Sequence, residues 1–345
     1  MIATAVEERQ RADELTALKV VVAAVKDEEE ALDRILWKAK RTLAPVALAA
    51  PTQGNLNILD EPSEDHHYLS QPEVGPKESK GMMKRAMLEW KQMGNGNLPA
   101  GVTVQVYEGR MDLLRATIEG PRDTPYEGGL FVFDICLPAQ YPAEPPKAFY
   151  WAYGKYLNPN LYECGKVCLS LLGTWDGPGW EPEVSTLLQL FVSIQGLILI
   201  EQPYCNEPGQ QRDGGSAAAT DYNKMVMAGV CDNMAKMIAS PPMGLSEVVA
   251  EFSAREGRNL LQRALLLPNE QCSDQHISSL DTALGHPFGL TVTGNPERCA
   301  AAAELVEEFE TESGGEAAAV PGWLTMAETP FVSRYVDDEM DNDDY

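Results

Sequence analysis

Four stretches of the chain have hydrophobic patterns that predict β-strands, and the first (Val-Thr-Val-Gln-Val-Tyr) alternates apolar and polar residues with the two-residue period of a strand. They begin at Val102, Leu113, Gly129 and Lys147, and the third (Gly-Leu-Phe-Val-Phe-Asp-Ile-Cys-Leu) is the strongest strand prediction. The segments between them are short and turn-rich, and connections of that length join antiparallel neighbours. Because strands and helices do not alternate, the pattern predicts an α+β fold. We expect a four-stranded antiparallel meander sheet packed on helices, rather than a doubly wound sheet.

Helical periodicity is present on both sides of the predicted sheet. Residues 80–93 place three large apolar residues on one helical face, which predicts core packing. A second stretch, residues 187–200, is apolar on nearly every side and predicts a central, buried helix. Further helices are predicted near 217–240, 244–255 and 258–267. The face predicted for the first helix consists of Met83, Met87 and Trp90.

The N-terminal region, residues 1–44, predicts a separate helix. Residues 4–44 contain no proline or glycine, and their apolar residues recur at alternating steps of three and four over about four heptads. That pattern is typical of a coiled-coil seam, through which two copies of the chain would form a homodimer. The alternative is an amphipathic helix that lies on the main domain.

Two further segments differ in composition from the region between them. Residues 45–78 contain five prolines and scattered polar residues, which predicts a linker. The pair His66-His67 lies there without cysteine at ligand spacing, so we interpret it as solvated loop rather than a metal site. Residues 268–345 predict an acidic, largely disordered tail, with a helix near 297–311. The core domain is therefore predicted to occupy residues 79–267.

Charge and cysteine usage exclude several classes of protein. The net charge of −25, from 27 basic and 52 acidic side chains, argues against nucleic-acid binding through phosphates and favours basic partners. Apolar runs such as Leu197 to Ile200 are too short to cross a membrane. Seven irregularly spaced cysteines do not predict a disulfide framework. We therefore expect a soluble protein of the cytoplasm, the nucleus or both.

The stretch from Asn158 to Ser170 concentrates the candidate chemistry. It contains a Pro-Asn turn, a glycine-centred turn and Cys168, which follows Asn160 by eight residues. This spacing predicts a thiol and a carboxamide on either side of one tight turn, close enough to act on one carbonyl group. A cysteine thiolate can accept an acyl group, and a nearby amide can stabilise the resulting oxyanion.

The surrounding motifs resemble those of the ubiquitin-conjugating enzymes over residues 80–240. The run Lys166 to Trp175 is closest to the branch that contains the large hybrid conjugating and ligating enzymes of animals and the phosphate-signalling conjugating enzymes of plants. In order, the motifs are Gly120-Pro121, Thr124 to Gly129 (Thr-Pro-Tyr-Glu-Gly-Gly), Tyr141-Pro142, Pro145-Pro146, Asn158-Pro159-Asn160, and Gly165 with Cys168-Leu169.

The resemblance implies a ubiquitin-conjugating (UBC) fold and an enzyme in an ATP-dependent pathway. Cys168 would accept ubiquitin as a thioester from a ubiquitin-activating enzyme and pass it to substrate lysines, with no cofactor or metal. Asn160 would stabilise the oxyanion, while its alternative role is to hold the turn through local hydrogen bonds. The resemblance places Glu207 where a carboxylate orients the incoming lysine, and the alternative is a solvated charge. Cys205 is a second candidate for a reactive thiol.

Departures from the family pattern suggest less dependence on separate ubiquitin ligases. Asn158 replaces the usual histidine, a position read as structural. Ala143 and the segment Trp180 to Glu183 (Trp-Glu-Pro-Glu) replace residues that help to dock RING-type ligases. A hybrid enzyme that selects its own, lysine-rich substrates is one hypothesis. The alternatives are a non-catalytic ubiquitin-binding variant, which Cys168 disfavours, and an enzyme for a ubiquitin-like modifier.

Overall fold

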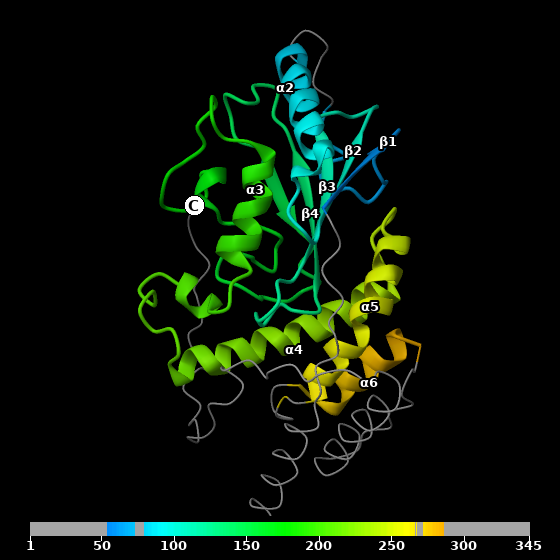
Figure 1. Ribbon diagram of the computed structural model, residues 1–345, viewed down its shortest axis with the longest axis vertical. Coiled ribbons are helices and arrows are strands. Elements are labelled where there is room, and N and C mark those ends of the chain that lie inside the picture. Colours follow the sequence, from blue (N-terminus) through cyan, green and yellow to red (C-terminus); the bar gives the residue numbers. More distant parts are fainter. Residues whose placement is uncertain (1–53, 73–78, 266, 268–271, 286–345) are drawn as a thin grey trace, which may run out of the picture.

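A five-stranded sheet forms the centre of the computed structural model, which describes residues 54–72, 79–265, 267 and 272–285 (Figure 1). The predicted N-terminal helix (1–44) and the acidic residues beyond 285 lie outside the described residues. The strands follow one another in the sheet in chain order. They are β1 (Asn55–Leu59), β2 (Val102–Tyr107), β3 (Leu113–Glu119), β4 (Leu130–Cys136) and β5 (Lys147–Tyr150).

Strands β2 to β5 form the predicted antiparallel meander, and β1 is a strand that the prediction lacked. It pairs in parallel with β2, with Asn55 opposite Thr103 and Leu59 opposite Tyr107. The linker prediction is therefore wrong for this part of residues 45–78. The sequence Asn-Leu-Asn-Ile-Leu is short, and asparagine is depleted in strands, so only the pairing with β2 reveals it.

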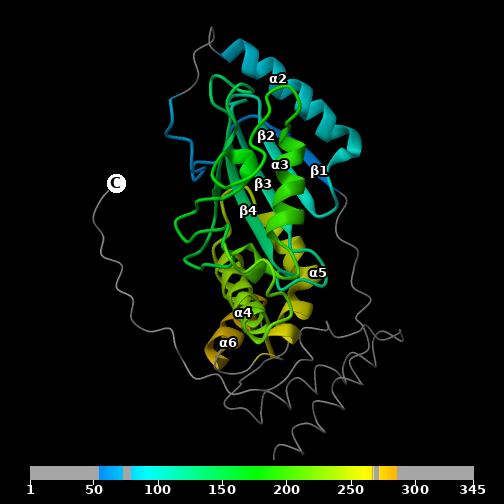
Figure 2. The ribbon, with the colours of Figure 1, turned by 90° about the vertical axis from the view of Figure 1, so that its left-hand side faces the viewer.

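The segment 60–72 covers the face of the sheet opposite helix α3 (Leu187–Ser193), as Figure 2 shows. His66 is buried, and its Nε2 atom lies 3.0 Å from the carbonyl oxygen of Leu114 on β3. The ring of His67 stacks on Phe149, with centroids 3.6 Å apart. The interpretation as solvated loop is therefore wrong for His66, which the sheet buries and supplies with a polar partner, whereas His67 is exposed although its ring stacks on the sheet.

A buried ion pair joins the centres of β3 and β4 beneath this segment. The Nε and Nη2 atoms of Arg115 donate to Asp134 at 2.6 and 2.9 Å, and both side chains are fully buried. Arg115 also donates to Asp65 Oδ1 at 2.9 Å, and the indole of Trp151 donates to Asp134 at 2.9 Å. Burial lowers the pKa of the neighbouring His66, although Asp134 opposes the shift. The charge of this network therefore comes from Arg115 and the two carboxylates.

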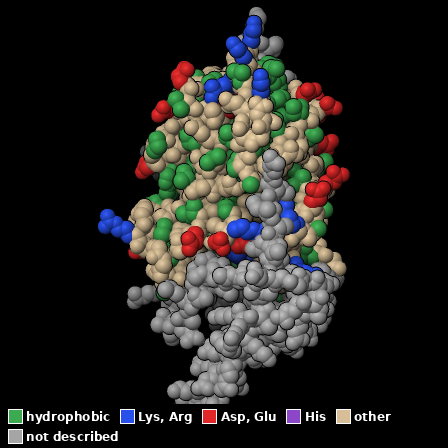
Figure 3. All heavy atoms as spheres, viewed as in Figure 1, with side chains coloured by type: hydrophobic (Ala, Val, Ile, Leu, Met, Phe, Trp, Pro, Cys, Tyr) green, Lys and Arg blue, Asp and Glu red, His purple; other side chains and the backbone are tan. Residues whose placement is uncertain are grey.

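Helix α2 (Ser79–Gln92), which continues into the helical turn η1 (Met93–Asn97), directs a different face inward from the one predicted. Met83 and Met87 are 38% and 61% exposed, whereas Trp90 is buried as expected. The predicted Met83–Met87 packing is wrong because a second apolar row, which includes Met82 and Ala86, lies one position away and faces the core. Lys80 and Lys84 line the same surface as the exposed methionines. Figure 3 shows blue side chains at the end of the molecule where α2 lies.

The helix predicted for residues 187–200 is shorter and less buried than expected. Helix α3 begins at a capping box formed by Thr186 and Gln189, and it continues as the turn η3 (Ile194–Ile198). Val192 and Leu197 are 49% and 59% exposed, so the element buries one side rather than its whole circumference.

The C-terminal helices lie together beyond one end of the sheet (Figures 1 and 2). They are α4 (Ala217–Ala239), α5 (Ser246–Leu265) and α6 (Asp274–Ala283). The two helices predicted over 244–267 form one helix, because Gly257 weakens a helix without ending it and packs directly against Leu284. Helix α6 corrects the tail prediction, since Ile277 and Leu280 are buried in the main core.

Helix α5 holds the loop between β3 and β4 through charged side chains. Glu127 receives hydrogen bonds from Arg263 at 2.6 Å and Asn259 at 3.2 Å, and Arg122 pairs with Glu256 at 2.7 Å. Burial alone would raise the pKa of Glu127, but Arg263 and the other donors bring it below its usual value. The carboxylate therefore stays ionised at neutral pH and fixes the loop to α5.

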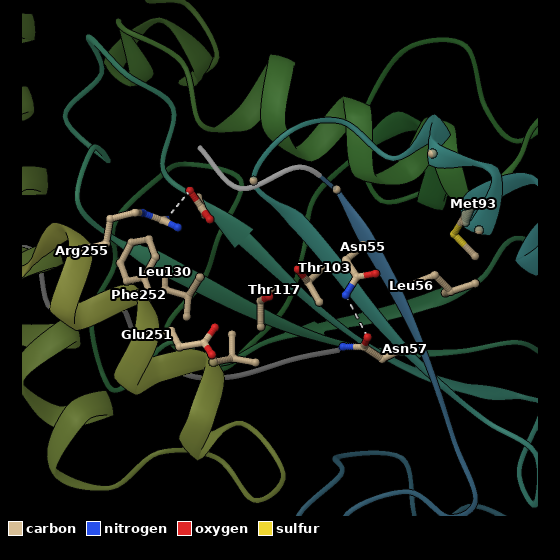
Figure 4. Close-up of a pocket in the computed structure, with 16 residues that line it drawn as sticks. Asn55, Leu56, Asn57, Met93, Thr103, Thr117, Leu130, Glu251, Phe252 and Arg255 are labelled. Carbon is tan, nitrogen blue, oxygen red and sulfur yellow. Dashed lines mark hydrogen bonds and ion pairs between the residues drawn. The ribbon is translucent and has the colours of Figure 1, made fainter. Parts of the chain in front are cut away.

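A cavity of about 550 Å³ lies between β1, the turn η1 and α5 (Figure 4). Its wall combines polar side chains, such as Asn55 and Thr117, with apolar ones, such as Phe252. None of its lining residues comes from the turn that carries Cys168. Among the described residues, no helix is long and apolar enough to cross a membrane.

Replacing Asp134 tests the buried ion pair. Asp134→Ala leaves the buried Arg115 with Asp65 as its carboxylate partner, and we expect the free energy of unfolding to fall by about 3–5 kcal/mol. Urea denaturation measures the loss. The control is Lys236→Ala, which removes a more exposed pair with Asp232 and is expected to change the same quantity by less than about 1 kcal/mol. Equal losses in the two variants would contradict the assignment.

Candidate active site

A hydrogen-bonded turn brings Cys168 and Asn160 together. Leu161 and Val167 form a β-bridge, and the backbone N–H of Cys168 donates to the carbonyl of Asn160 at 2.9 Å. The carboxamide Nδ2 of Asn160 donates to the carbonyl of Cys168, also at 2.9 Å. The predicted thiol and amide therefore lie across one turn. That last bond uses one of the two amide hydrogens, so holding the turn and binding an oxyanion are compatible roles for Asn160.

The turn is fixed to the rest of the domain by the fully buried Asn158. Its Nδ2 atom donates to the hydroxyl of Tyr126 at 2.7 Å and to the carbonyl of Ile198 at 2.8 Å. Its Oδ1 atom accepts a hydrogen bond from the backbone N–H of Asn160 at 2.7 Å. Burial raises the pKa of Tyr126 well above its usual value, so its hydroxyl remains protonated. Asn158 thus links the turn to η3 and to the β3–β4 loop.

Aromatic side chains that the sequence analysis did not select border the cysteine. Cys168 itself is only 2% exposed. Burial and the adjacent Cys168 thiol raise the pKa of Tyr162, and the ring of Tyr156 meets the Tyr162 ring edge-on at 5.9 Å. The ammonium of Lys166 lies 5.5 Å from the centroid of Tyr162. Tyr162 lies opposite Lys166 in the hairpin that leads to Cys168. This position is the sequence signal that could have identified Tyr162 and Lys166.

Glu207 follows the turn η4 (Pro203–Asn206) and is exposed. Burial raises the pKa of Tyr156 to about 12, and the charge of Glu207 adds to this shift. Asn206 fixes η4 by donating to the carbonyl of Leu197 at 3.0 Å. The carboxylate of Glu207 is thus near enough to Tyr156 to affect its pKa. The role of Glu207 stays a prediction. Cys205 is half-buried in η4, and its sulfur lies near Gly214.

Comparison with known proteins identifies the domain that carries this site. Residues 85–228 match the family model described as ubiquitin-conjugating enzyme. The chain contains a ubiquitin-conjugating domain. The matched residues include Asn158, Asn160, Cys168 and Glu207, and they lie within the core domain predicted over residues 79–267.

Relatives of this domain are found in plants and animals. "Probable ubiquitin-conjugating enzyme E2 26" of Arabidopsis thaliana is 46% identical over 196 residues, which are 55% of this chain and 36% of that protein. "Probable ubiquitin-conjugating enzyme E2 25" of the same plant is 51% identical over 167 residues, 48% of this chain and 27% of the relative. Human "Dual E2 ubiquitin-conjugating enzyme/E3 ubiquitin-protein ligase BIRC6" is 38% identical over 170 residues, 46% of this chain and 4% of the relative. The chain thus spans only part of the length of these relatives.

Two loops of the ubiquitin-conjugating domain form an acidic surface. The indole of Trp180 donates to the carbonyl of Pro142 at 2.7 Å, which holds the two loops together. The neighbouring Ala143, Glu144 and Glu181 are exposed. This is the surface on which the sequence departs from the family pattern, and it presents a methyl group and carboxylates to solvent.

Replacing Asn158 tests whether it is a structural residue. Asn158→Ala leaves the hydroxyl of Tyr126, the carbonyl of Ile198 and the N–H of Asn160 without this partner, and buried unsatisfied groups cost about 1–3 kcal/mol each. We expect the free energy of unfolding to fall by about 3 kcal/mol in urea denaturation. The control Asn206→Ala loses one more exposed bond and is expected to cost about 1 kcal/mol or less. A loss for Asn158→Ala no larger than that of the control would contradict a structural role.

Proposed function

We propose that this chain is a ubiquitin-conjugating enzyme that carries ubiquitin as a thioester on Cys168. The observation that supports the proposal is the position of Cys168, which lies opposite Asn160 in a hydrogen-bonded turn within the matched domain. A non-catalytic, ubiquitin-binding variant would have no use for a cysteine at this point. A ubiquitin-like modifier in place of ubiquitin is the alternative that the charging experiment below distinguishes.

Two acyl transfers make up the reaction. The Cys168 thiolate first attacks the thioester that joins ubiquitin to the activating enzyme, and the cysteine of that enzyme leaves as a thiolate. A substrate lysine then attacks the new thioester, a carbon–nitrogen bond forms, and Cys168 leaves. Both steps pass through a tetrahedral oxyanion, to which we assign the second amide hydrogen of Asn160.

The incoming lysine needs a site that orients its amine and accepts its proton. Glu207 is exposed beside Tyr156, and Tyr156 packs against Tyr162 next to the thiol. We assign Glu207 to orient the amine and to accept the proton, directly or through water. The two tyrosine rings form a wall along which the aliphatic part of a lysine can pack.

The acidic surface around Ala143 and Trp180 supports transfer with little help from a RING-type ligase. It lacks a large apolar side chain at Ala143 and exposes Glu144 and Glu181. With the net charge of −25, this surface favours lysine-rich protein substrates. The human relative that combines conjugating and ligating activities in its name supports the same hybrid role.

A charging assay with activating enzyme, ATP and ubiquitin tests the central proposal. We expect the wild type to form an adduct that thiol reagents release, and Cys168→Ser to form none, or an oxyester that hydroxylamine cleaves. Cys205→Ser and Cys164→Ser should charge normally, because these thiols lie outside the turn that holds Cys168 opposite Asn160. A wild-type chain that is not charged by ubiquitin would refute the proposal, and charging by a ubiquitin-like modifier instead would identify the alternative.

Lysine discharge in the presence of RING domains tests ligase dependence. The charged wild type should transfer ubiquitin to a lysine-rich protein faster than to an acidic one, with little stimulation by a panel of RING domains. Ala143→Phe restores an apolar side chain, and we expect it to increase the stimulation. Strong stimulation of the wild type by several RING domains would be evidence against the hybrid role.

A further inference from the structure

Lys166 and Cys168, the proposed acyl carrier, lie on one face of the hairpin in which Leu161 pairs with Val167. Lys166 and Val167 take part in β-bridges, with Phe149 and Leu161 respectively. Side chains alternate along extended backbone, and Val167 is buried in the core, so Lys166 and Cys168 project from the opposite side. Two extended residues span about 7 Å, a distance that a lysine side chain of comparable length can cover.

The amine of Lys166 is held by an aromatic ring that borders the thiol. The backbone N–H of Tyr162 donates to the carbonyl of Lys166 at 3.0 Å, which makes the two residues cross-strand neighbours. The Lys166 ammonium lies 5.5 Å from the centroid of the Tyr162 ring, whose hydroxyl end borders Cys168. The cation–π contact therefore places a primary amine at the edge of the site where an acceptor lysine has to arrive.

Lys166 also differs from lysines that have structural partners. Lys155 and Lys236 both pair with Asp232, and Lys224 pairs with Asp221. The ion pairs found among the described residues do not include Lys166, which is exposed. A lysine held by a neutral ring can leave it without breaking a salt bridge, so its amine can move to a nearby carbonyl.

We propose that Lys166 is a self-modification site of this chain. The inference rests on the proposed function, because the acyl group has to reach Cys168 first. The neutral ε-amine of Lys166 attacks the carbonyl carbon of the Cys168 thioester, so that a carbon–nitrogen bond forms and the carbon–sulfur bond breaks. Cys168 leaves as a thiolate, and the amine loses its proton to water. The isopeptide-linked ubiquitin then remains at the edge of the site and limits further turnover when acceptor lysines are scarce.

The experiment uses the full chain with activating enzyme, ATP and ubiquitin, without an acceptor protein. We expect the thioester to convert into a thiol-resistant adduct that peptide mapping places on Lys166. The rate should be first order and independent of the concentration of the chain, because the amine and the thioester belong to one molecule. Proximity of this kind corresponds to a high effective concentration.

Lys166→Arg is the decisive variant, because it keeps the positive charge and removes the nucleophilic amine. We expect it to form the Cys168 thioester and to lower the rate of the thiol-resistant adduct at least about tenfold. The matched control is Lys84→Arg, an exposed lysine on α2, which should leave the adduct unchanged. Tyr162→Leu removes the ring beneath the ammonium and should lower the fraction of the thioester that converts to the adduct.

The outcomes separate this inference from the function on which it rests. A thioester that forms while the stable adduct maps to other lysines, or persists in Lys166→Arg, overturns the self-modification and leaves the proposed function intact. A rate that rises with the concentration of the chain also overturns it, since the transfer would then occur between molecules. Absence of any thioester on the wild type overturns both.

Discussion

The geometry of the candidate active site depends on the hydrogen bonds of the Asn158 carboxamide. This carboxamide is buried among three groups from three parts of the chain, and it donates to two of them and accepts from the third. A histidine at this position could not supply the same two donors and one acceptor from adjacent atoms, because its ring nitrogens point in different directions. A histidine at this position would therefore have to hold the turn with a different set of hydrogen bonds.

The domain is larger than the region that matches the family. The added parts cover the faces of the sheet. Both faces of β3 and β4 are buried, although residues 85–228 alone make up the matched domain. The segment 60–72 brings Asp65 and His66 to the buried pair of Arg115 and Asp134, and the loop before α5 contributes the carbonyl of Met243. A buried arginine requires such partners, since an unpaired charge in the core is strongly destabilising. The extensions and the core charges thus depend on each other.

The parts of the fold that the sequence predicted are those with local signals. Short apolar runs between turn-rich segments identified β2 to β5, and the turn motifs located Cys168 opposite Asn160. β1 was missed because its evidence is the pairing with β2 and not its own composition. The inward face of α2 was misjudged because two apolar rows lie one position apart, and only packing against the sheet chooses between them. Tyr156 was missed for a similar reason, since its contact with Tyr162 forms only in the folded chain.

The low exposure of Cys168 limits how the proposed acyl group can reach the thiol. Backbone hydrogen bonds, together with Asn158 and Asn160, fix the turn on both sides of the thiol, so the backbone offers little freedom to open the site. The side chains of Tyr156 and Tyr162 are more exposed than Cys168, and their rings contact each other. Rotation of such side chains takes place far faster than a rearrangement of the fold. A rigid turn beside side chains that can rotate suits the proposed role of Cys168, which has to accept one large partner and then admit another.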